Sequence, residues 1–289
     1  MSRQDKQILK RIAGVLAAVL FVGWFLFWPL NYYIETPGTA DNLKSYVTVK
    51  GHPDKHKGSY MITSVYLQQA RPATYIWAHF DPQATIEKAS DVTGGQSGAT
   101  YNKVQNFYMK SAINEAITVA YKAAHQEYTK QYLGIYVLEV EKQSKFKNDL
   151  KVGDTITEVD GRHFDTAQGY QKYIANQKVG QDLTITYLHN GKKHQTTHKL
   201  IKIMGDRAGI GILLTDNVKI HTKIPVKVDP GQLGGPSGGL MFSLQIYQQV
   251  SGENLRHGRK IAGTGTIAPD GSVCLLYTSD AADDTPCVD

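Results

Sequence analysis

Cysteine is almost missing from this sequence. Only two of its 289 residues are cysteine, Cys274 and Cys287, and both lie within the last sixteen positions. A body without thiols suits a protein exported from the cytoplasm, because oxidising compartments cross-link stray cysteines. With 41% hydrophobic residues the chain can still build a packed core, so an entirely disordered chain is excluded.

Two further absences exclude nucleic acid and ATP as partners. The net charge is +6, but the excess of Lys and Arg is spread along the chain. No basic run alternates with aromatic residues, as is typical of nucleic-acid-binding surfaces. The phosphate-binding loop Gly-x-x-x-x-Gly-Lys-Ser/Thr does not occur either, so we expect no dependence on ATP.

Metal ions and other cofactors are not expected. Three histidines, His189, His194 and His198, lie close together in the sequence. Residues four apart share a face of a strand and residues five apart do not, so the three side chains point partly to opposite sides. No nearby carboxylate completes a ligand set, and a solvated hairpin is the better interpretation.

A long uncharged run follows a basic N-terminus. Residues 1–11 hold four Lys or Arg, whereas residues 12–30 hold no charged side chain. A helix of that length, rising about 1.5 Å per residue, spans roughly the 30 Å hydrocarbon core of a bilayer. Aromatic residues at its far end are expected at the outer membrane interface: Trp24, Trp28, Tyr32 and Tyr33.

We therefore predict a single-pass membrane protein whose N-terminus is cytoplasmic and whose bulk is extracellular. The reason is that Lys- and Arg-rich segments beside a transmembrane helix stay on the cytoplasmic side of the membrane. A cleaved signal peptide is the alternative. The residues after the run, Trp-Pro-Leu-Asn-Tyr-Tyr, are too bulky for a cleavage site, and the small residues 38–40 are distant. An uncleaved anchor at 12–30 is thus favoured.

The segment before residue 130 mixes strand and helix signals. Residues 45–50 and 59–67 are rich in β-branched and aromatic side chains and are predicted to be strands. Residues 93–100 (TGGQSGAT) are typical of a loop. Apolar residues then recur three or four apart over 102–128, which predicts a helix.

Short strands dominate the next part of the chain. A strand is predicted at 133–140, and another inside 151–164, before an Asp-Gly turn. Residues 166–178 show a short amphipathic helix. Residues 182–201 form two predicted strands of alternating polar and apolar residues, joined by Asn190-Gly191. An Asn-Gly pair between such strands is among the strongest short-range hairpin signals.

This order of elements resembles a PDZ domain over residues 131–202. Residues 150–161 (LKVGDTITEVDG) match the family's Leu-x-x-Gly-Asp-x-Ile-x-x-Val-Asp-Gly element. The resemblance implies capture of an extended peptide by strand addition, with backbone amides holding a terminal carboxylate. Four residues line up with the family's carboxylate-binding loop: Leu133, Gly134, Ile135 and Tyr136.

A glycine-rich turn after two further predicted strands presents a candidate nucleophile, Ser237. The turn precedes a predicted helix, whose first amides could stabilise the oxyanion of a tetrahedral intermediate. Ser237 could instead be only the N-cap of that helix. The turn also contains Gly-x-Ser-x-Gly, but an α/β-hydrolase needs a later acid and then a histidine, which this chain does not supply. The backbone loop expected to form the oxyanion site comprises Gly234, Gly235, Pro236 and Gly238, and its glycines let a substrate backbone approach closely.

The turn at 235–239 matches the Gly-Pro-Ser-small-Gly sequence around the nucleophile of the Lon proteolytic domain. Residues 260–273 resemble that family's Thr-Gly-x-Ile strand and Gly-x-Val turn. Over about residues 10–273 the chain resembles the membrane-anchored, PDZ-containing Lon-like serine proteases of Gram-positive bacteria. The resemblance implies a serine endopeptidase with a Ser–Lys dyad that acts on peptide or protein substrates without ATP.

The same resemblance implies an α+β fold in which a PDZ-like β-rich domain is inserted into a Lon-type proteolytic domain. The predicted order is a cytoplasmic tail (1–11), a transmembrane anchor (12–30), the first part of the protease domain (35–130), the PDZ-like domain (131–202), the catalytic part (205–273) and a foreign tail (274–289).

The expected lysine is missing from this copy. In the family it follows the Gly-x-Val turn within a Gly-Gly-Ile-x-x-Lys element, which places it near position 282. Ala282 stands there, and no lysine follows Lys260. We interpret residues 274–289 as an artefactual tail in place of the natural C-terminus. Little or no peptidase activity is therefore expected from the chain as printed, and a membrane-tethered PDZ adaptor that binds peptides without catalysis is the alternative function.

Overall fold

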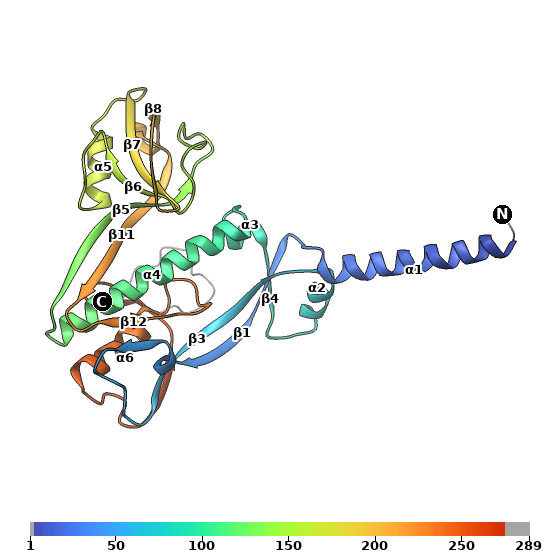
Figure 1. Cartoon of the computed structure of the whole chain (residues 1–289), viewed down its shortest axis with the longest axis horizontal. Coiled ribbons are helices and arrows are strands. Elements are labelled where there is room, and N and C mark those ends of the chain that lie inside the picture. Colours follow the sequence, from blue (N-terminus) through green and yellow to red (C-terminus); the bar gives the residue numbers. More distant parts are fainter. Residues whose placement is uncertain (1–2, 275–289) are drawn as a thin grey trace. The chain divides into compact units, whose positions relative to one another are not determined.

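The computed structural model describes residues 3–274, and the chain divides into two compact units. The first unit comprises residues 1–40 and 63–98, and the second comprises residues 41–62 and 99–289. Helices and strands occur in both (Figure 1), so the mixed α+β class predicted from the sequence is confirmed. The finer domain boundaries remain predictions.

The N-terminal helix α1 (Arg3–Phe27) has no buried residue. In the part of the chain that the structure describes, α1 is the one helix that is long and apolar enough to cross a membrane. A signal sequence near an N-terminus has the same length and composition, so these properties fit both interpretations. The helix ends at Phe27, before Pro29, because a proline disfavours helical geometry in the residue that precedes it.

The rest of the first unit is small. It holds the first part of β1 (Tyr32–Asn42), the second part of β3 (Ser59–Gln69), α2 (Pro72–Ala78), β4 (Thr85–Lys88) and α3 (Ala89–Thr93). Strands β1 and β4 pair antiparallel. A small core forms around Ile34, Ala70 and Ala78.

The burial of two tyrosines corrects one sequence-based expectation. Tyr33 was expected at the membrane interface, but its side chain is only 9% exposed. Tyr32 packs against Tyr75 of α2, with ring centroids 5.1 Å apart. These tyrosines therefore contribute to the fold of the first unit, whereas Trp24 and Trp28 remain exposed.

The second unit has one core around two helices. Helix α4 begins at the unit boundary (Gly98–Ala123), and α6 (Gly239–Ser251) packs on β2 (Val47–Val49), the 3₁₀ turn η1 (Leu43–Ser45) and β14 (Thr266–Ile267). Strand β12 (Val226–Val228) pairs with β2, β13 (Lys260–Gly263) runs parallel to residues 59–62 of β3, and β14 pairs with β15 (Val273–Cys274). The largest buried side chains of this core include Tyr60, Tyr121 and Phe242.

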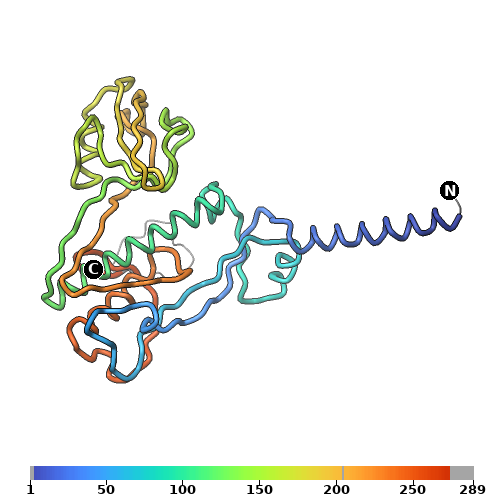
Figure 2. The backbone as a smooth tube through the Cα atoms, in the orientation of Figure 1, coloured from blue at the N-terminus to red at the C-terminus, as the bar shows by residue number. Residues whose placement is uncertain are grey.

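A second core lies in a five-stranded antiparallel sheet of order β11-β5-β6-β7-β8. Its strands are β5 (Tyr128–Val140), β6 (Thr155–Val159), β7 (Asp182–His189), β8 (Lys192–Lys199) and β11 (Ile212–Thr222), with helix α5 (Ala167–Ala175) beside them. A small pair, β9 (Ile201–Lys202) and β10 (Ala208–Gly209), flanks the 3₁₀ turn η2 (Met204–Asp206). Figure 2 traces the chain out along β5 and back along β11.

The predicted hairpin is confirmed. Strands β7 and β8 pair from Asp182↔Lys199 to His189↔Lys192. Asn190 and Gly191 form the turn with φ of 50° and 77°. Two consecutive positive φ angles are what a type I′ turn requires, and Asn-Gly adopts them at low cost.

Two of the three histidines of this hairpin have carboxylate partners, which the sequence analysis did not find. The Nδ1 atom of His189 lies 2.7 Å from Asp154 Oδ1, and the Nε2 atom of His198 lies 2.6 Å from Asp149 Oδ2. The hydrogen bond from His198 holds the pKa of Asp149 below its usual value. These pairs tie the hairpin to the segment before β6. No group of three or more potential metal ligands is found among residues 3–274.

Candidate functional site

Ser237 lies in the turn that leads into α6. The N-cap of α6 is Gly238, and no side chain caps the helix. The interpretation of Ser237 as a capping serine is therefore wrong, because it lies one residue before the cap. Its side chain is half-buried, and its hydroxyl has no hydrogen-bond partner among the described residues.

Two segments of the sequence meet at this serine. The carbonyl of Ser237 accepts hydrogen bonds from the Gly265 N–H (2.7 Å) and from the Thr264 hydroxyl (2.9 Å). In return, the N–H of Leu240 donates to the Gly265 carbonyl at 3.0 Å. The Thr-Gly pair that follows β13 is thus bonded to both sides of the turn, and it fixes the backbone from which the Ser237 side chain projects.

The glycines of the turn have structural reasons to be glycine. Gly235 has φ of +86°, and its N–H donates to the carbonyl of Gln105 in α4. A Cβ on Gly238 would lie 2.8 Å from Ile62 and 2.9 Å from Phe242. Close packing and backbone conformation account for these two positions, so the approach of a substrate is not needed to explain glycine there. Gly234 is exposed, and a Cβ there would lie 3.2 Å from the Cβ of Gln105, a tight contact as well.

The start of α6 offers free amides beside the serine. Within residues 3–274, no acceptor is found for the N–H groups of Ser237 and Gly238, and Pro236 has no N–H. Amides at a helix start carry the positive end of the helix dipole. They can stabilise the negative oxygen that forms when a nucleophile attacks a carbonyl. The arrangement is chemically suited to acyl transfer once a base is supplied.

The predicted position of the base lies outside the described residues. It is position 282, where Ala282 replaces the expected lysine. Lys260, the last lysine in the sequence, is exposed at the start of β13.

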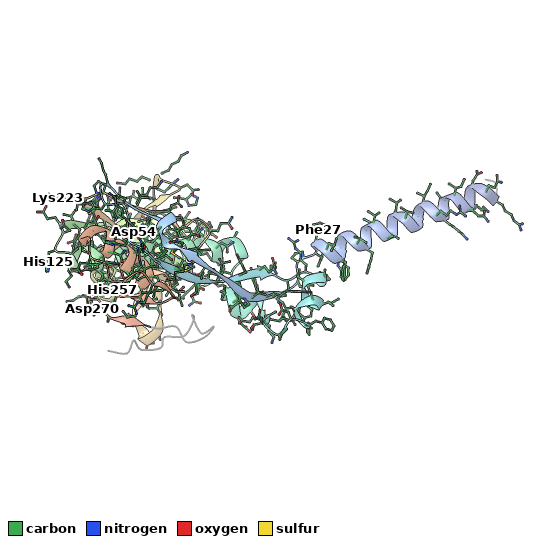
Figure 3. The ribbon with its side chains drawn as sticks, turned by 90° about the horizontal axis from the view of Figure 1, so that it is seen from below. Phe27, Asp54, His125, Lys223, His257 and Asp270 are labelled. Atoms are coloured by element: carbon green, nitrogen blue, oxygen red, sulfur yellow. The ribbon has the colours of Figure 1, made fainter. Side chains whose placement is uncertain are left out.

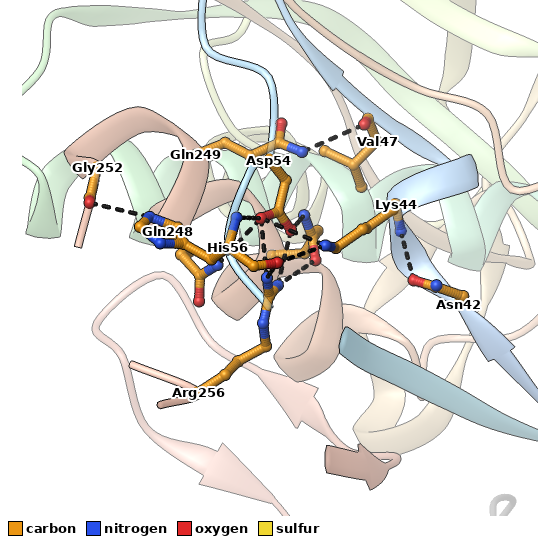
Figure 4. Close-up of polar contacts among 10 residues, drawn as sticks. Asn42, Lys44, Val47, Asp54, His56, Gln248, Gln249, Gly252 and Arg256 are labelled. Carbon is orange, nitrogen blue, oxygen red and sulfur yellow. Dashed lines mark hydrogen bonds and ion pairs between the residues drawn. The ribbon is translucent and has the colours of Figure 1, made fainter. Parts of the chain in front are cut away.

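Behind α6 lies a buried ion pair that the sequence analysis missed (Figure 4). The Arg256 side chain is 0% exposed and the Asp54 side chain 3%. The guanidinium makes two hydrogen bonds to the carboxylate, of 2.7 and 2.8 Å, and a third of 3.1 Å to the carbonyl of His56. Gln245 of α6 donates to Asp54 at 3.0 Å, and Lys44 lies 3.7 Å away.

Burial alone would raise the pKa of Asp54. Hydrogen bonds from Arg256 and Gln245, together with the positive charges of Arg256 and Lys44, outweigh burial and lower the pKa to about 2. The guanidinium carbon also lies 5.2 Å from the ring centre of Tyr60 on β3. This cluster joins the loop before β3, helix α6 and the segment after α6, and so supports the turn that carries Ser237.

The residues proposed from sequence to bind a peptide lie within β5. At Ile135 and Tyr136, this strand pairs with β11 on one side and with β6 on the other. A peptide cannot add to a strand whose two edges are already paired. Tyr136 also stacks on Phe107 of α4, with ring centroids 3.6 Å apart. Strand addition is therefore blocked on both sides at Ile135 and Tyr136, whereas peptide binding at Leu133 and Gly134 stays a prediction.

The sheet has two edge strands, β8 and β11, and the edge beside α5 belongs to β11. Among residues 3–274 no strand pairs with its outer side, and α5 packs against it. The N–H of Ala167, the first residue of α5, donates to Asp216 Oδ1 of β11 at 2.6 Å. A helix beside an unpaired strand edge is an arrangement suited to receiving an extended peptide.

Two tyrosine hydroxyls near this helix lack partners. The hydroxyls of Tyr132 and Tyr170 are buried and make no hydrogen bond with described residues. Burial, followed by the nearby charges of Asp216 and Asp165, raises the pKa of Tyr132. Buried polar groups are normally paired, so these two hydroxyls mark where water or a ligand would complete the structure.

Residues 101–200 match the family described as PDZ domain. The chain thus contains a PDZ domain. Similar solved structures include the PDZ domains of SdrC-like proteins from Listeria monocytogenes and Listeria innocua, each 38% identical. The first similarity covers 29% of this chain and 90% of the other, with a TM-score of 0.28; the second covers 28% and 92%, with a TM-score of 0.27. No curated protein matches the chain.

The PDZ match and the observed sheet differ in extent. The match begins inside α4, whereas the sheet runs from β5 to β11 and ends at Thr222. The sequence-based boundary at 202–205 falls between β9 and β10, which pair with each other. Strand β11 therefore belongs to the same sheet as the PDZ domain, although it lies after residue 202, where the domain was expected to end.

Proposed function

We propose that this PDZ-domain protein is the nucleophile-bearing part of an ATP-independent serine endopeptidase, anchored in the cell membrane by α1 and acting outside the cytoplasm. One observation carries the proposal. The two segments that resemble the Lon proteolytic domain, 235–239 and 260–273, are hydrogen-bonded to each other at Ser237. Free amides at the start of α6 lie in the same turn.

In this proposal the Ser237 hydroxyl attacks the scissile carbonyl of a peptide. A neutral lysine takes the hydroxyl proton, and the amides of the turn bind the oxyanion. Collapse of the tetrahedral intermediate expels the amine, which takes the proton back, and water then hydrolyses the acyl-enzyme. Because Ala282 stands at the expected lysine position, the printed chain lacks this base and should be inactive.

The test joins residues 1–273 to a C-terminal element that contains Gly-Gly-Ile-x-x-Lys. We expect this chain to hydrolyse unfolded protein substrates, and Ser237→Ala to lower kcat by about 10⁴-fold or more, as loss of a nucleophile does elsewhere. Ser251→Ala is the matched control, because Ser251 lies at the far end of the same helix and bonds only locally. Equal hydrolysis by the Ser237→Ala variant would contradict the proposal.

We further propose that peptides bind along β11, between its free edge and α5. The support is the sheet order, in which β11 is an edge strand while β5 is paired on both sides. A bound peptide would form hydrogen bonds with the backbone N–H and C=O groups on the outer edge of β11. It would also bring polar groups near the Tyr132 and Tyr170 hydroxyls, which lack hydrogen-bond partners among the described residues.

Amide hydrogen exchange distinguishes the two strands. With a saturating C-terminal peptide, we expect slower exchange at 212–216 on β11 and no change at 133–136 on β5, because only the edge strand gains hydrogen bonds. Slower exchange confined to 133–136 would refute the β11 groove and restore the placement predicted from the sequence.

A non-enzymatic adaptor is the second candidate, and the PDZ match favours it directly. In that case, peptide binding at the PDZ domain would be the whole function. The adaptor predicts that binding survives Ser237→Ala and that no chain, with or without the added lysine element, cleaves a peptide. Turnover that depends on Ser237 would exclude it.

A further inference from the structure

The outer face of α2 is apolar, although no described residue of the first unit covers it. Ile76 and Trp77 of α2 are 51% and 53% exposed, and Phe80, in the turn two residues beyond the end of α2, is 82% exposed. They lie within one helical turn of each other, so they form one surface. The inner face is apolar as well, because Pro72 and Ala78 are buried. A surface helix of a soluble domain is normally polar on its outer side.

The segment is also free of charge. Residues 72–80 (PATYIWAHF) contain no Asp, Glu, Lys or Arg, and charged residues flank the segment at Arg71 and Asp81. Tryptophan, tyrosine and phenylalanine on an uncharged helix are typical of segments that lie at a membrane–water interface. A protein-binding surface would more often carry polar or charged side chains at its rim.

Helix α2 lies against the end of α1, within the same unit. The N–H of Leu30 donates to the carbonyl of Ala70 at 2.8 Å, and the Arg71 guanidinium lies 5.7 Å from the ring centre of Phe27. Figure 3 shows Phe27 where α1 meets the rest of the first unit. The apolar surface of α1, none of whose residues is buried, therefore continues onto α2.

We propose that α2 lies in the bilayer interface, with Ile76, Trp77 and Phe80 inserted among the lipid headgroups and upper acyl chains. Helices of this kind reach about 5–10 Å into that boundary. The inference rests on the proposed anchoring role of α1 but not on peptidase activity. It gives the protein a second lipid contact, which fixes the first unit against the membrane surface.

Tryptophan fluorescence can test each contact by itself. The chain has three tryptophans, Trp24, Trp28 and Trp77. The full chain is reconstituted into phosphatidylcholine–phosphatidylglycerol vesicles whose acyl chains carry bromine at a shallow or a deep position. In Trp24→Phe/Trp28→Phe, only Trp77 emits, and we expect shallow bromine to quench it more than deep bromine. In Trp28→Phe/Trp77→Phe, only Trp24 emits and reports on α1.

The two reporters separate the two proposals. Quenching of Trp24 without quenching of Trp77 overturns the interfacial role of α2 and leaves the anchor intact. Quenching of Trp77 alone supports the interfacial role and removes the anchor. Blue-shifted Trp77 emission that no brominated lipid quenches indicates a protein partner and overturns the inference.

A second variant checks that the exposed side chains are responsible. Ile76→Ser/Phe80→Ser, in the chain with Trp77 as sole reporter, should lower the quenching of Trp77 by about half or more, because membrane affinity scales with buried apolar area. Val179→Ser is the control, since Val179 is equally exposed, at 51%, but lies in the PDZ domain. Far-UV circular dichroism should show all variants folded, and unchanged quenching in the double variant contradicts the inference.

Discussion

Replacing Arg256 by methionine is expected to lower the free energy of unfolding by about 3–5 kcal/mol. Breaking a buried ion pair by removing one partner leaves an uncompensated charge, which costs that amount. Here the remaining carboxylate, Asp54, has a side chain only 3% exposed and would lose its guanidinium partner while keeping Lys44, Gln245 and the His56 N–H. Denaturant unfolding measures the loss.

A matched control lies three residues later. Arg259→Met makes the same substitution at an exposed arginine and should change stability by less than about 1 kcal/mol. The Asp54→Asn/Arg256→Met double variant should lose less than the sum of the two single variants, since neither charge is then left alone. Additive losses would show that the two residues do not act as a pair.

The same pair predicts how stability depends on pH. The pKa of Asp54 is about 2 in the folded chain and about 3.9 in an unfolded one. A lowered folded-state pKa contributes stability above about pH 4, and that contribution is lost as the pH falls from about 4 to about 2. Arg256→Met should flatten the unfolding free energy across this window, because it removes the main cause of the shift.

Replacing Gly58 by alanine is the second large effect we expect, with a loss of about 3 kcal/mol or more. Gly58 has φ of +81°, which costs an L-residue about 1–2 kcal/mol. A Cβ there would also collide with the backbone carbonyl of Arg259. That carbonyl accepts the Ser59 N–H at the start of β3, so the clash would push β13 away from β3.

Gly51 is the matched control for this substitution. Its φ is +79°, nearly the same, but a Cβ added to it would meet no atom within 4 Å apart from its own chain neighbours. Gly51→Ala should therefore cost only the backbone strain, and the difference between the two variants measures the clash. Equal losses in thermal unfolding would contradict this account of Gly58.

The clash at Gly58 should also affect the serine turn. Strand β13 leads directly to Thr264 and Gly265, which bond the carbonyl of Ser237. In the chain that carries the added lysine element, Gly58→Ala should lower kcat more than Gly51→Ala does. That result would connect the packing of β13 with the position of the nucleophile.

Local patterns predicted the individual elements of the PDZ domain well. Asn190-Gly191 specifies a type I′ turn by its own backbone preferences, so the hairpin was predictable from the short strands on either side of it. The apolar run of α1 and the apolar residues that recur three or four apart in α4 are also patterns within a single short segment. The predicted helix at 102–128 and the observed Gly98–Ala123 differ only at their ends.

Features that depend on distant partners were not predictable. The strand that pairs with the outer side of β5 is β11, which begins only at Ile212, and no pattern within β5 reveals it. The predicted groove therefore included Ile135 and Tyr136, which are paired on both sides. Likewise, Asp54 and Arg256 are 202 residues apart, and each looks like a surface charge in its own sequence context.

The glycines at Ser237 illustrate a further limit. A Gly-Pro-Ser-Gly-Gly turn indicates a special backbone, but sequence alone does not separate a catalytic reason from a packing reason. Gly238 is required by Ile62 and Phe242, whichever function the turn has. The hydrogen bonds from Thr264 and Gly265 carry more information, because they join the two segments on which the peptidase resemblance depends.

Covalent labelling of Ser237 tests the central claim most directly, because it needs no knowledge of the substrate. The chain with the added lysine element is treated with a fluorophosphonate, and the modified residue is located by mass spectrometry. The account predicts one adduct, on Ser237, that disappears when the added lysine is changed to methionine. No adduct, or labelling that is independent of that lysine, would contradict an activated serine and leave the PDZ domain as the functional part of the chain.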